Sequence, residues 1–298
     1  MIADVPRAEG PKPPWLKSPI PAGERYFKLR RQLAERGLAT ICQSGRCPNI
    51  SECWNNRHAT FLILGTICTR SCRFCSVDKG CPQPIEAGEV DAVLEMAELM
   101  DLQYAVVTSV TRDDLPDGGS GHFATVIARL KTSRPAMRIE VLIPDFCGDH
   151  SALERVIAAG PDVIAHNLEA VRPVFPLLGR PDSRYGQSLA VLRYLADHGA
   201  QPIKSGLMVG LGEGEAEIEQ TMNDLLRAGV RLLTIGQYLR PTRHHVPVTR
   251  YYPPAEFATL KEKALTLGFA ACEAGHFVRS SYRSAQMYRS VMHEVPGL

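Results

Sequence analysis

Long apolar runs are absent from this sequence: no stretch approaches the roughly 20 residues that a membrane-spanning helix needs. The opening segment MIADVPRAEGPKPPW has no apolar core of a secretion signal and lacks the Arg- and Ser-rich pattern of a transit peptide. Dense basic runs are also absent, and the net charge is +2, which disfavours a nucleic-acid partner. We therefore expect a cytoplasmic protein that engages neither membrane nor nucleic acid.

Cysteine is plentiful by comparison. The nine cysteines cannot all form disulfides, because their number is odd. In a reducing compartment, clustered cysteines serve as metal ligands more often than as disulfides. The 298 residues, 45% hydrophobic and 22% charged, are enough for one large α/β domain whose core folds without metals.

Six apolar segments alternate with amphipathic ones from residue 59 onward. Strands are predicted at 59–65, 104–110, 138–143, 162–167, 202–210 and 231–238, and helices at 87–101, 121–133, 150–159, 187–199, 215–228 and 254–267. Nearly continuous apolar strands are typical of a parallel sheet that is covered on both faces. The pattern predicts an α/β fold: a partial (β/α)6 TIM-like barrel with N- and C-terminal extensions. A doubly wound sheet is the alternative, because strand order is not fixed by the sequence.

The chain is expected to form one compact domain overall, in three parts: an N-terminal extension with three cysteines (1–58), the barrel (59–245) and a C-terminal extension (246–298). Within the first part, we predict a proline-rich extended arm over 1–20, a helix over 23–37 and a loop from Cys42 to Cys53.

The strongest local signal is the C-x3-C-x2-C spacing of Cys68, Cys72 and Cys75 after the first barrel strand. Three thiolates on a four-iron cubane leave one iron open to a substrate or cofactor. A closed zinc or ferredoxin-like site completed by Cys81 is the plain alternative. Zinc sites usually pair C-x2-C knuckles and ferredoxins use C-x2-C-x2-C, so the spacing favours the open cluster.

A second, separate triad is formed by Cys42, Cys47 and Cys53, spaced C-x4-C-x5-C. A structural zinc site completed by His58 is one interpretation. An auxiliary iron–sulfur cluster held by three thiolates is the other.

The Cys68 loop, with Phe74 in its aromatic position, resembles that of the radical S-adenosylmethionine (SAM) enzymes. Both triads together with Arg-Ser-Ser-Tyr at 279–282 resemble the lipoyl synthase family. The segments that carry this resemblance are CPNISECW (47–54), RDDLPDGG (112–119), LIPDF (142–146), AHNLEAV (165–171), KSGLMVGLGE (204–213) and QYLRPTRHHVPV (237–248). It extends from KPPWLK (12–17) to the serine segment.

The resemblance implies radical insertion of two sulfur atoms at C6 and C8 of an octanoyl-lysine on a lipoyl carrier domain. It implies two [4Fe–4S] clusters and SAM as cofactors, with sulfur drawn from the auxiliary cluster. The implied partners are octanoylated carrier domains, an electron donor such as ferredoxin or flavodoxin, and an iron–sulfur carrier that repairs the auxiliary cluster.

By position, the resemblance makes Cys68, Cys72 and Cys75 the ligands of the radical SAM cluster, and Cys42, Cys47, Cys53 and Ser281 those of the auxiliary cluster. Ser280 stays open as the alternative to Ser281, because adjacent serines are not separable by spacing. Arg279 is expected to orient Ser281 or the surroundings of the second cofactor.

Further residues of the resemblance are expected to bind SAM: Phe74, Gly118, Gly119, Asn167, Glu169, Lys204 and Ser205. Five of them also have a plain structural interpretation: a tight turn for the two glycines, strand ends for Asn167 and Glu169, and a solvated charge for Lys204. The group Arg240, Arg243, His244 and His245 is expected to face the carrier domain or the octanoyl-lysine. Cys81, Cys147 and Cys272 have no predicted role.

The sequence leaves three competing functions. A methylthiotransferase acting on tRNA would need an RNA-binding module and a more basic surface, and the sequence shows neither. Biotin synthase resembles the core chemistry but not the N-terminal C-x4-C-x5-C. A non-catalytic zinc or iron–sulfur protein would use Cys81 and His58 to close the two sites.

Overall fold

The computed structural model describes residues 12–18 and 20–292, which fall into two units. The β2–β6 unit comprises the described residues of 18–71 and 76–164, and the β8–β10 unit comprises those of 12–17, 72–75 and 165–292. Most of the predicted arm over 1–20 lies outside the described residues, and its described part contains the short 3-10 helix η1 (Pro14–Leu16).

Parallel strands form the centre of the β2–β6 unit. β2 (Thr60–Ile63) pairs with β5 (Tyr104–Ser109), β5 pairs with β6 (Arg138–Leu142), and β1 (Ala39–Thr40) runs antiparallel to β2. Phe61, Val107 and Val141 are paired across the three strands and are each 0% exposed. This apolar row is part of the buried core of the unit, and the removal of these side chains from water stabilises the pairing of the three strands.

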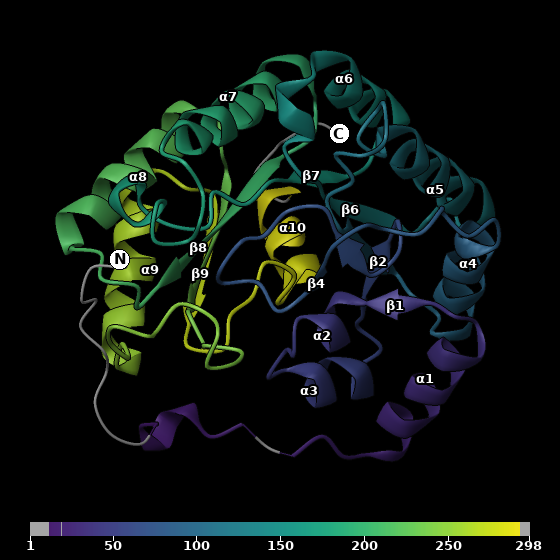
Figure 1. The fold of residues 1–298 in the computed structure, drawn as a ribbon, viewed down its shortest axis with the longest axis horizontal. Coiled ribbons are helices and arrows are strands. Elements are labelled where there is room, and N and C mark those ends of the chain that lie inside the picture. The colour runs from purple at the N-terminus through teal and green to yellow at the C-terminus, as the bar shows by residue number, and fades with distance from the viewer. Residues whose placement is uncertain (1–11, 19, 293–298) are drawn as a thin grey trace. The chain divides into compact units, whose positions relative to one another are not determined.

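Helices cover the strands of this unit: α1 (Glu24–Glu35), α2 (Ile41–Ser44), α3 (Ile50–Asn55), α4 (Glu89–Leu99), α5 (Ser120–Ser133) and α6 (His150–Ala159). α4 packs on α5 and α5 packs on α6, side by side along one side of the strands (Figure 1). The remaining elements are the two-residue strands β3 (Ile67–Cys68) and β4 (Asp78–Lys79), the 3-10 helix η2 (Phe146–Gly148) and the first two residues of β7 (Val163–Ala165), whose last residue belongs to the other unit.

The β8–β10 unit repeats the alternation of strand and helix. β8 (Ile203–Val209), β9 (Leu232–Gln237) and β10 (Ala271–Gly275) are parallel neighbours. Around them lie η3 (Arg172–Val174), α7 (Ser183–His198), α8 (Glu215–Arg227), α9 (Pro254–Leu267) and α10 (Ser284–Met292). α8 and α9 lie on one side of β8 and β9 and α10 on the other (Figure 1).

The predicted α/β class and the six predicted strands are confirmed, with ends that differ by a few residues. The helix predicted at 254–267 is α9, which starts at Pro254 and stops before Gly268, whose φ is +117°. The predicted loop from Cys42 to Cys53 is wrong, because α2 and α3 form there. β10 was not predicted: its sequence ACEAG has no β-branched residue and little apolar bulk.

No helix in residues 12–18 and 20–292 has the length and apolar character to cross a membrane.

The contact between α5 and η2 gives a test of the core. Phe123 is 0% exposed, and its ring meets that of Phe146 edge to face at 6.2 Å. Phe123→Ala is expected to lower the free energy of unfolding by about 3–5 kcal/mol, because the vacated volume cannot refill completely. Phe27, which is 56% exposed, is the matched control, and Phe27→Ala should change stability by about 0.5 kcal/mol or less. Urea unfolding followed by circular dichroism measures both, and equal midpoints would contradict this packing.

Candidate functional site

The N-terminal cysteine triad gathers within the β2–β6 unit. Cys42 lies in α2 and Cys53 in α3, and Cys47 connects back through a hydrogen bond from its N–H to the Cys42 carbonyl (2.9 Å). Burial, and after it repulsion from the Cys47 thiolate, raises the pKa of Cys42 to about 11 and that of Cys53 to about 12. Three thiols that suppress each other's ionisation need a cationic partner to become thiolates together.

Trp54 supplies a test of whether this triad fits a metal–sulfur centre. Its side chain is 1% exposed, its ring lies 5.3 Å from that of Tyr26 on α1, and its Nε1 atom is buried without a hydrogen-bond partner. The indole also favours the thiolate of Cys42, since it lowers the pKa against the larger effect of burial. A buried N–H beside a ligand sulfur is a usual outer partner of a metal–thiolate site.

No three His, Cys, Asp or Glu side chains in the described part of the chain are grouped to hold one metal ion. An iron–sulfur cubane does not need three side chains around one ion, because each thiolate ligates a different iron. The triad beside Trp54 therefore fits a cluster in its donor chemistry.

Cys68 lies at the end of β3, where several backbone hydrogen bonds hold it. The Arg70 N–H donates to Cys68 Sγ (3.4 Å), and the Gly80 N–H donates to the Cys68 carbonyl (3.0 Å). Thr69 donates through both N–H and Oγ1 to the Thr111 carbonyl (3.1 and 3.0 Å). The start of the predicted ligand loop is thus attached to the segment that follows β5.

Arg70 connects the same loop to the segments that follow β5 and β6. Its guanidinium donates to both carboxylate oxygens of Asp113 (2.7 and 2.8 Å) and to Asp145 (2.6 Å), whose side chain is 0% exposed. Cys147 Sγ lies 3.4 Å from Arg70 Nη2. The hydrogen bonds from Arg70 hold the pKa of Asp113 below its ordinary value. Sequence reasoning missed this cluster, although an arginine between two cysteines of the predicted triad and aspartates after two strands were available signals.

The other half of the loop, Cys72–Cys75, belongs to the β8–β10 unit. The Arg73 N–H donates to the Leu178 carbonyl (2.9 Å), and the Arg73 carbonyl accepts from the Val246 N–H (3.1 Å). His245 Nε2 lies 2.9 Å from the Cys75 carbonyl. His245 therefore contacts the cysteine segment itself, and Phe74 is partly exposed within that segment.

The C-terminal serines are distinguished by Asn167. Asn167 Nδ2 donates to Ser280 Oγ (2.7 Å), so this hydroxyl is engaged. Asn167 Oδ1 is buried without a partner, which leaves an acceptor for an amino or hydroxyl group of a ligand. Arg279 Nη1 donates to the Val278 carbonyl (2.7 Å) and to that of Gln237 (3.4 Å), so Arg279 shapes the segment ahead of Ser281.

The other predicted SAM residues of this unit are well buried. Lys204 is 1% exposed and donates to Ser284 Oγ (2.7 Å), so it is no solvated strand-end charge. Ser205 is 0% exposed and accepts from the Leu168 N–H (3.1 Å). Glu169 has a φ of +81°, and burial raises its pKa while Arg180 opposes the shift.

Gly118 and Gly119 have φ values of +61° and +90° and precede α5. A Cβ at Gly119 would lie 2.4 Å from Leu64 Cδ1, and one at Gly118 would lie 2.9 Å from Phe146 Cδ1. Both glycines are required by close protein packing as well as by the turn. Of the remaining cysteines, Cys81 and Cys147 are exposed, and Cys272 is buried, with a pKa raised to about 12 by burial.

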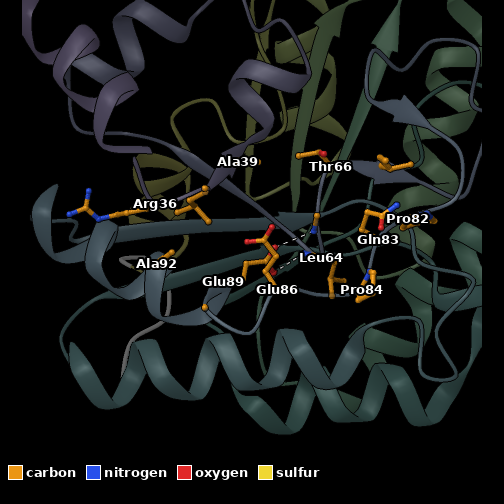
Figure 2. A pocket seen from close by; sticks show the side chains of 15 residues that line it. Arg36, Ala39, Leu64, Thr66, Pro82, Gln83, Pro84, Glu86, Glu89 and Ala92 are labelled. Carbon is orange, nitrogen blue, oxygen red and sulfur yellow. Dashed lines mark hydrogen bonds between the residues drawn. The ribbon is translucent and has the colours of Figure 1, made fainter. Parts of the chain in front are cut away.

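A cavity of about 310 Å³ lies beside the turn that leads from β2 to Cys68. Figure 2 shows its lining, with Glu89 reaching to Leu64, and with Arg36, Pro82 and Glu86 around it.

Comparisons with known proteins define the class of this fold and site. Residues 62–225, more than half of the chain, match the sequence model of the radical SAM superfamily. A solved structure of SuiB from Streptococcus suis bound to S-adenosylmethionine aligns with a TM-score of 0.56 at 10% identity, over 85% of this chain and 58% of that one. This similarity concerns the fold alone, and it agrees with the predicted partial (β/α) barrel.

The nearer relatives narrow the class to one family. Residues 6–47 match the model of the N-terminal domain of lipoyl synthase of the radical SAM family. The lipoyl synthase of Rubrobacter xylanophilus is 49% identical over 92% of this chain and 85% of its own length. That of Bacteroides thetaiotaomicron is 50% identical over 93% of this chain and 98% of its own length. The chain belongs to the lipoyl synthase family.

The expected activity is thereby confirmed: the protein is a radical SAM sulfurtransferase of lipoate biosynthesis, with SAM and [4Fe–4S] clusters, one of them auxiliary, as cofactors. Its substrates are lipoyl carrier proteins.

Arg70 gives the test of the loop geometry. Arg70→Gln is expected to lower the free energy of unfolding by about 3 kcal/mol, because it removes the guanidinium that pairs with the buried Asp145 carboxylate. Arg129→Gln is the control: it breaks an exposed pair with Asp91 and should cost about 1 kcal/mol or less. Anaerobic urea unfolding of both variants makes the comparison, and similar midpoints would show that the Arg70 cluster contributes no more than a surface pair.

Proposed function

We propose that Cys68, Cys72 and Cys75 bind the [4Fe–4S] cluster that receives SAM. The C-x3-C-x2-C spacing supports this assignment, and so do the hydrogen bonds that fix the loop on either side of these cysteines. An open iron on this cluster is the place for the amino and carboxylate groups of SAM.

The auxiliary cluster is proposed on Cys42, Cys47 and Cys53, with Ser281 as the fourth ligand. The observation that carries this proposal is the gathering of the three thiols beside the unpartnered Nε1 of Trp54. The reaction needs a source of sulfur, because two sulfur atoms must enter the octanoyl chain and cleavage of SAM transfers none. An auxiliary cluster would be that source.

The cofactors supply a 5′-deoxyadenosyl radical, which removes hydrogen atoms from unactivated carbons, and sulfide, which replaces them. No side chain acts as a general base in this scheme, because C6 and C8 carry no acidic proton. The work of the protein is to position the octanoyl chain and to keep water away.

Asn167 is the best supported of the proposed SAM contacts, because its buried Oδ1 lacks a partner. Glu169, whose pKa is raised by burial, is proposed as a neighbouring polar contact. Phe74, Gly118, Gly119, Lys204 and Ser205 complete the proposed set on the basis of sequence position. Arg279 is proposed to orient Ser281 through its hold on the Val278 carbonyl.

The finer partners are part of the proposal as well. We expect an electron donor such as ferredoxin or flavodoxin, and an iron–sulfur carrier that rebuilds the auxiliary cluster after each turnover. A cytoplasmic location is proposed because clustered free cysteines serve as ligands in reducing compartments.

The experiment uses anaerobically reconstituted protein with dithionite, SAM and an octanoyl-lysyl peptide. A singly thiolated peptide followed by a dithiolated one, with two SAM molecules cleaved per product, is expected. Cleavage of SAM without sulfur in the peptide would reject the substrate. No cleavage by protein that carries both clusters would favour a non-catalytic iron–sulfur protein.

Ser280 and Ser281 give the sharpest single-residue contrast. Ser281→Ala is expected to reduce formation of dithiolated peptide by about 100-fold, since it removes a proposed ligand. Ser280→Ala loses only the contact with Asn167 and should stay within about tenfold of the wild type. Single-turnover product analysis by mass spectrometry checks both, and the reverse order of effects would move the ligand to Ser280.

A further inference from the structure

The turn after β2 has an unusual backbone that a single carboxylate holds. Leu64 and Gly65 have φ values of +67° and +86°, in the left-handed region that leucine seldom adopts. Their N–H groups both donate to Glu89: Leu64 to Oε2 (2.8 Å) and Gly65 to Oε1 (3.1 Å) (Figure 2). Successive N–H groups in such a turn make an anion-binding concavity, and the Glu89 side chain fills it.

Leu64 is also held on its other sides. Arg112, which is 3% exposed and paired with Asp114, donates from Nη1 to the Leu64 carbonyl (3.1 Å). The Leu64 side chain is 0% exposed and packs where Gly119 leaves no room for a Cβ. The N–H, the carbonyl and the side chain of one residue are therefore fixed at once, which is how a strained conformation persists.

The carboxylate itself is anchored from two helices. Glu89 is the first residue of α4, where the positive end of the helix dipole favours an anion. His122 on α5 places Nε2 2.7 Å from Glu89 Oε2, and the two side chains are only 15% and 11% exposed. Glu89 can therefore move little without disturbing α4 and α5.

Cys68 follows Gly65 by three positions and has little other regular structure to place it. β3 contains only Ile67 and Cys68, and it pairs with the two residues of β4. The direction in which the chain leaves the Leu64–Gly65 turn therefore sets the approach to Cys68 from its N-terminal side, whereas the hydrogen bonds from Gly80 and Arg70 hold the cysteine from its C-terminal side.

We propose that Glu89 and Arg112 are positioning residues for Cys68, and that they set the geometry of this ligand in the radical SAM cluster. This inference rests on the assignment of Cys68 as a ligand in the proposed function. Glu89 touches neither substrate nor cofactor in this proposal, and it acts through the backbone of the turn.

The test is Glu89→Gln in protein that also carries Cys42→Ala, Cys47→Ala and Cys53→Ala, so that only the radical SAM cluster is observed. An amide keeps the size of the side chain but turns an NH₂ group toward one of the two backbone N–H donors, so at least one contact is lost. The matched control is Glu86→Gln, which changes the same residue type in the lining of the same cavity.

Two readouts besides activity are measured: release of ferrous iron to a chelator, and the electron paramagnetic resonance spectrum of the reduced cluster with and without SAM. Glu89→Gln is expected to release iron about tenfold faster and to alter the spectrum with SAM, as loss of an outer partner of a metal site typically does. The KM for SAM should rise more than kcat falls. Glu86→Gln should match the parent protein in every readout.

A purely structural role is excluded by a stability control. Ile127→Val trims a fully buried side chain of α5 without touching the turn. If Glu89→Gln lowers the melting temperature but, like Ile127→Val, leaves iron release and spectrum unchanged, the proposal is overturned. If Glu89→Gln does not accumulate, Arg112→Lys is measured in its place, and parent-like values there overturn the proposal equally.

Failure of the proposed function has a different signature. Cys68→Ala in the same background should lose the cluster. If it keeps a full complement of iron and sulfide, the ligand assignment is wrong, whatever Glu89→Gln does.

Discussion

A thiolate holds iron in a fixed geometry only when its backbone is held, and the segment that carries Cys68 has almost no regular structure of its own. Charged side chains replace that structure here. Glu89 fixes the turn before the cysteine, and Arg70 fixes the residues after it, through Asp113 and the buried Asp145. Because these groups are largely removed from water, each lost contact leaves an unsatisfied polar atom inside the protein. The position of Cys68 therefore follows from buried polar contacts more than from strand pairing.

In the β8–β10 unit, backbone groups hold the second part of the cysteine loop in place. The Cys72–Cys75 segment is hydrogen-bonded through both the N–H and the carbonyl of Arg73, and His245 reaches the carbonyl of Cys75. His245 comes from the segment after β9, as Asp113 comes from the segment after β5. Residues beyond the carboxyl ends of parallel strands thus serve both parts of the ligand loop, which is the general use of these ends in β/α barrels.

The sequence predicts the regular elements and the metal chemistry well, because both are local patterns. Apolar runs between turn residues give the strands, and cysteine spacing gives the two triads. α2 and α3 could not be predicted from the sequence pattern, since helices of four and six residues are too short to show a helical period. The partners of Arg70 and Glu89 could not be predicted for another reason, which is their distance along the sequence. Arg70 and Asp113 are 43 residues apart in the sequence, and Glu89 and Leu64 are 25 apart. Such pairs form only after the folding of the sheet has brought the ends of neighbouring strands together.

The two adjacent serines show how tertiary contacts separate what spacing leaves equal. Asn167 engages Ser280, and Lys204 engages Ser284, so the segment between them is attached on both sides of Ser281. A hydroxyl oxygen is a harder donor than thiolate and a poorer match for iron–sulfur chemistry, so it gains from being positioned before it binds. Lys204 is 1% exposed, and burying its amino group is costly unless that group is hydrogen-bonded; Ser284 accepts its hydrogen bond three residues after Ser281. The proposed serine ligand, being weak and on a well-fixed backbone, would then leave the iron without displacing the segment.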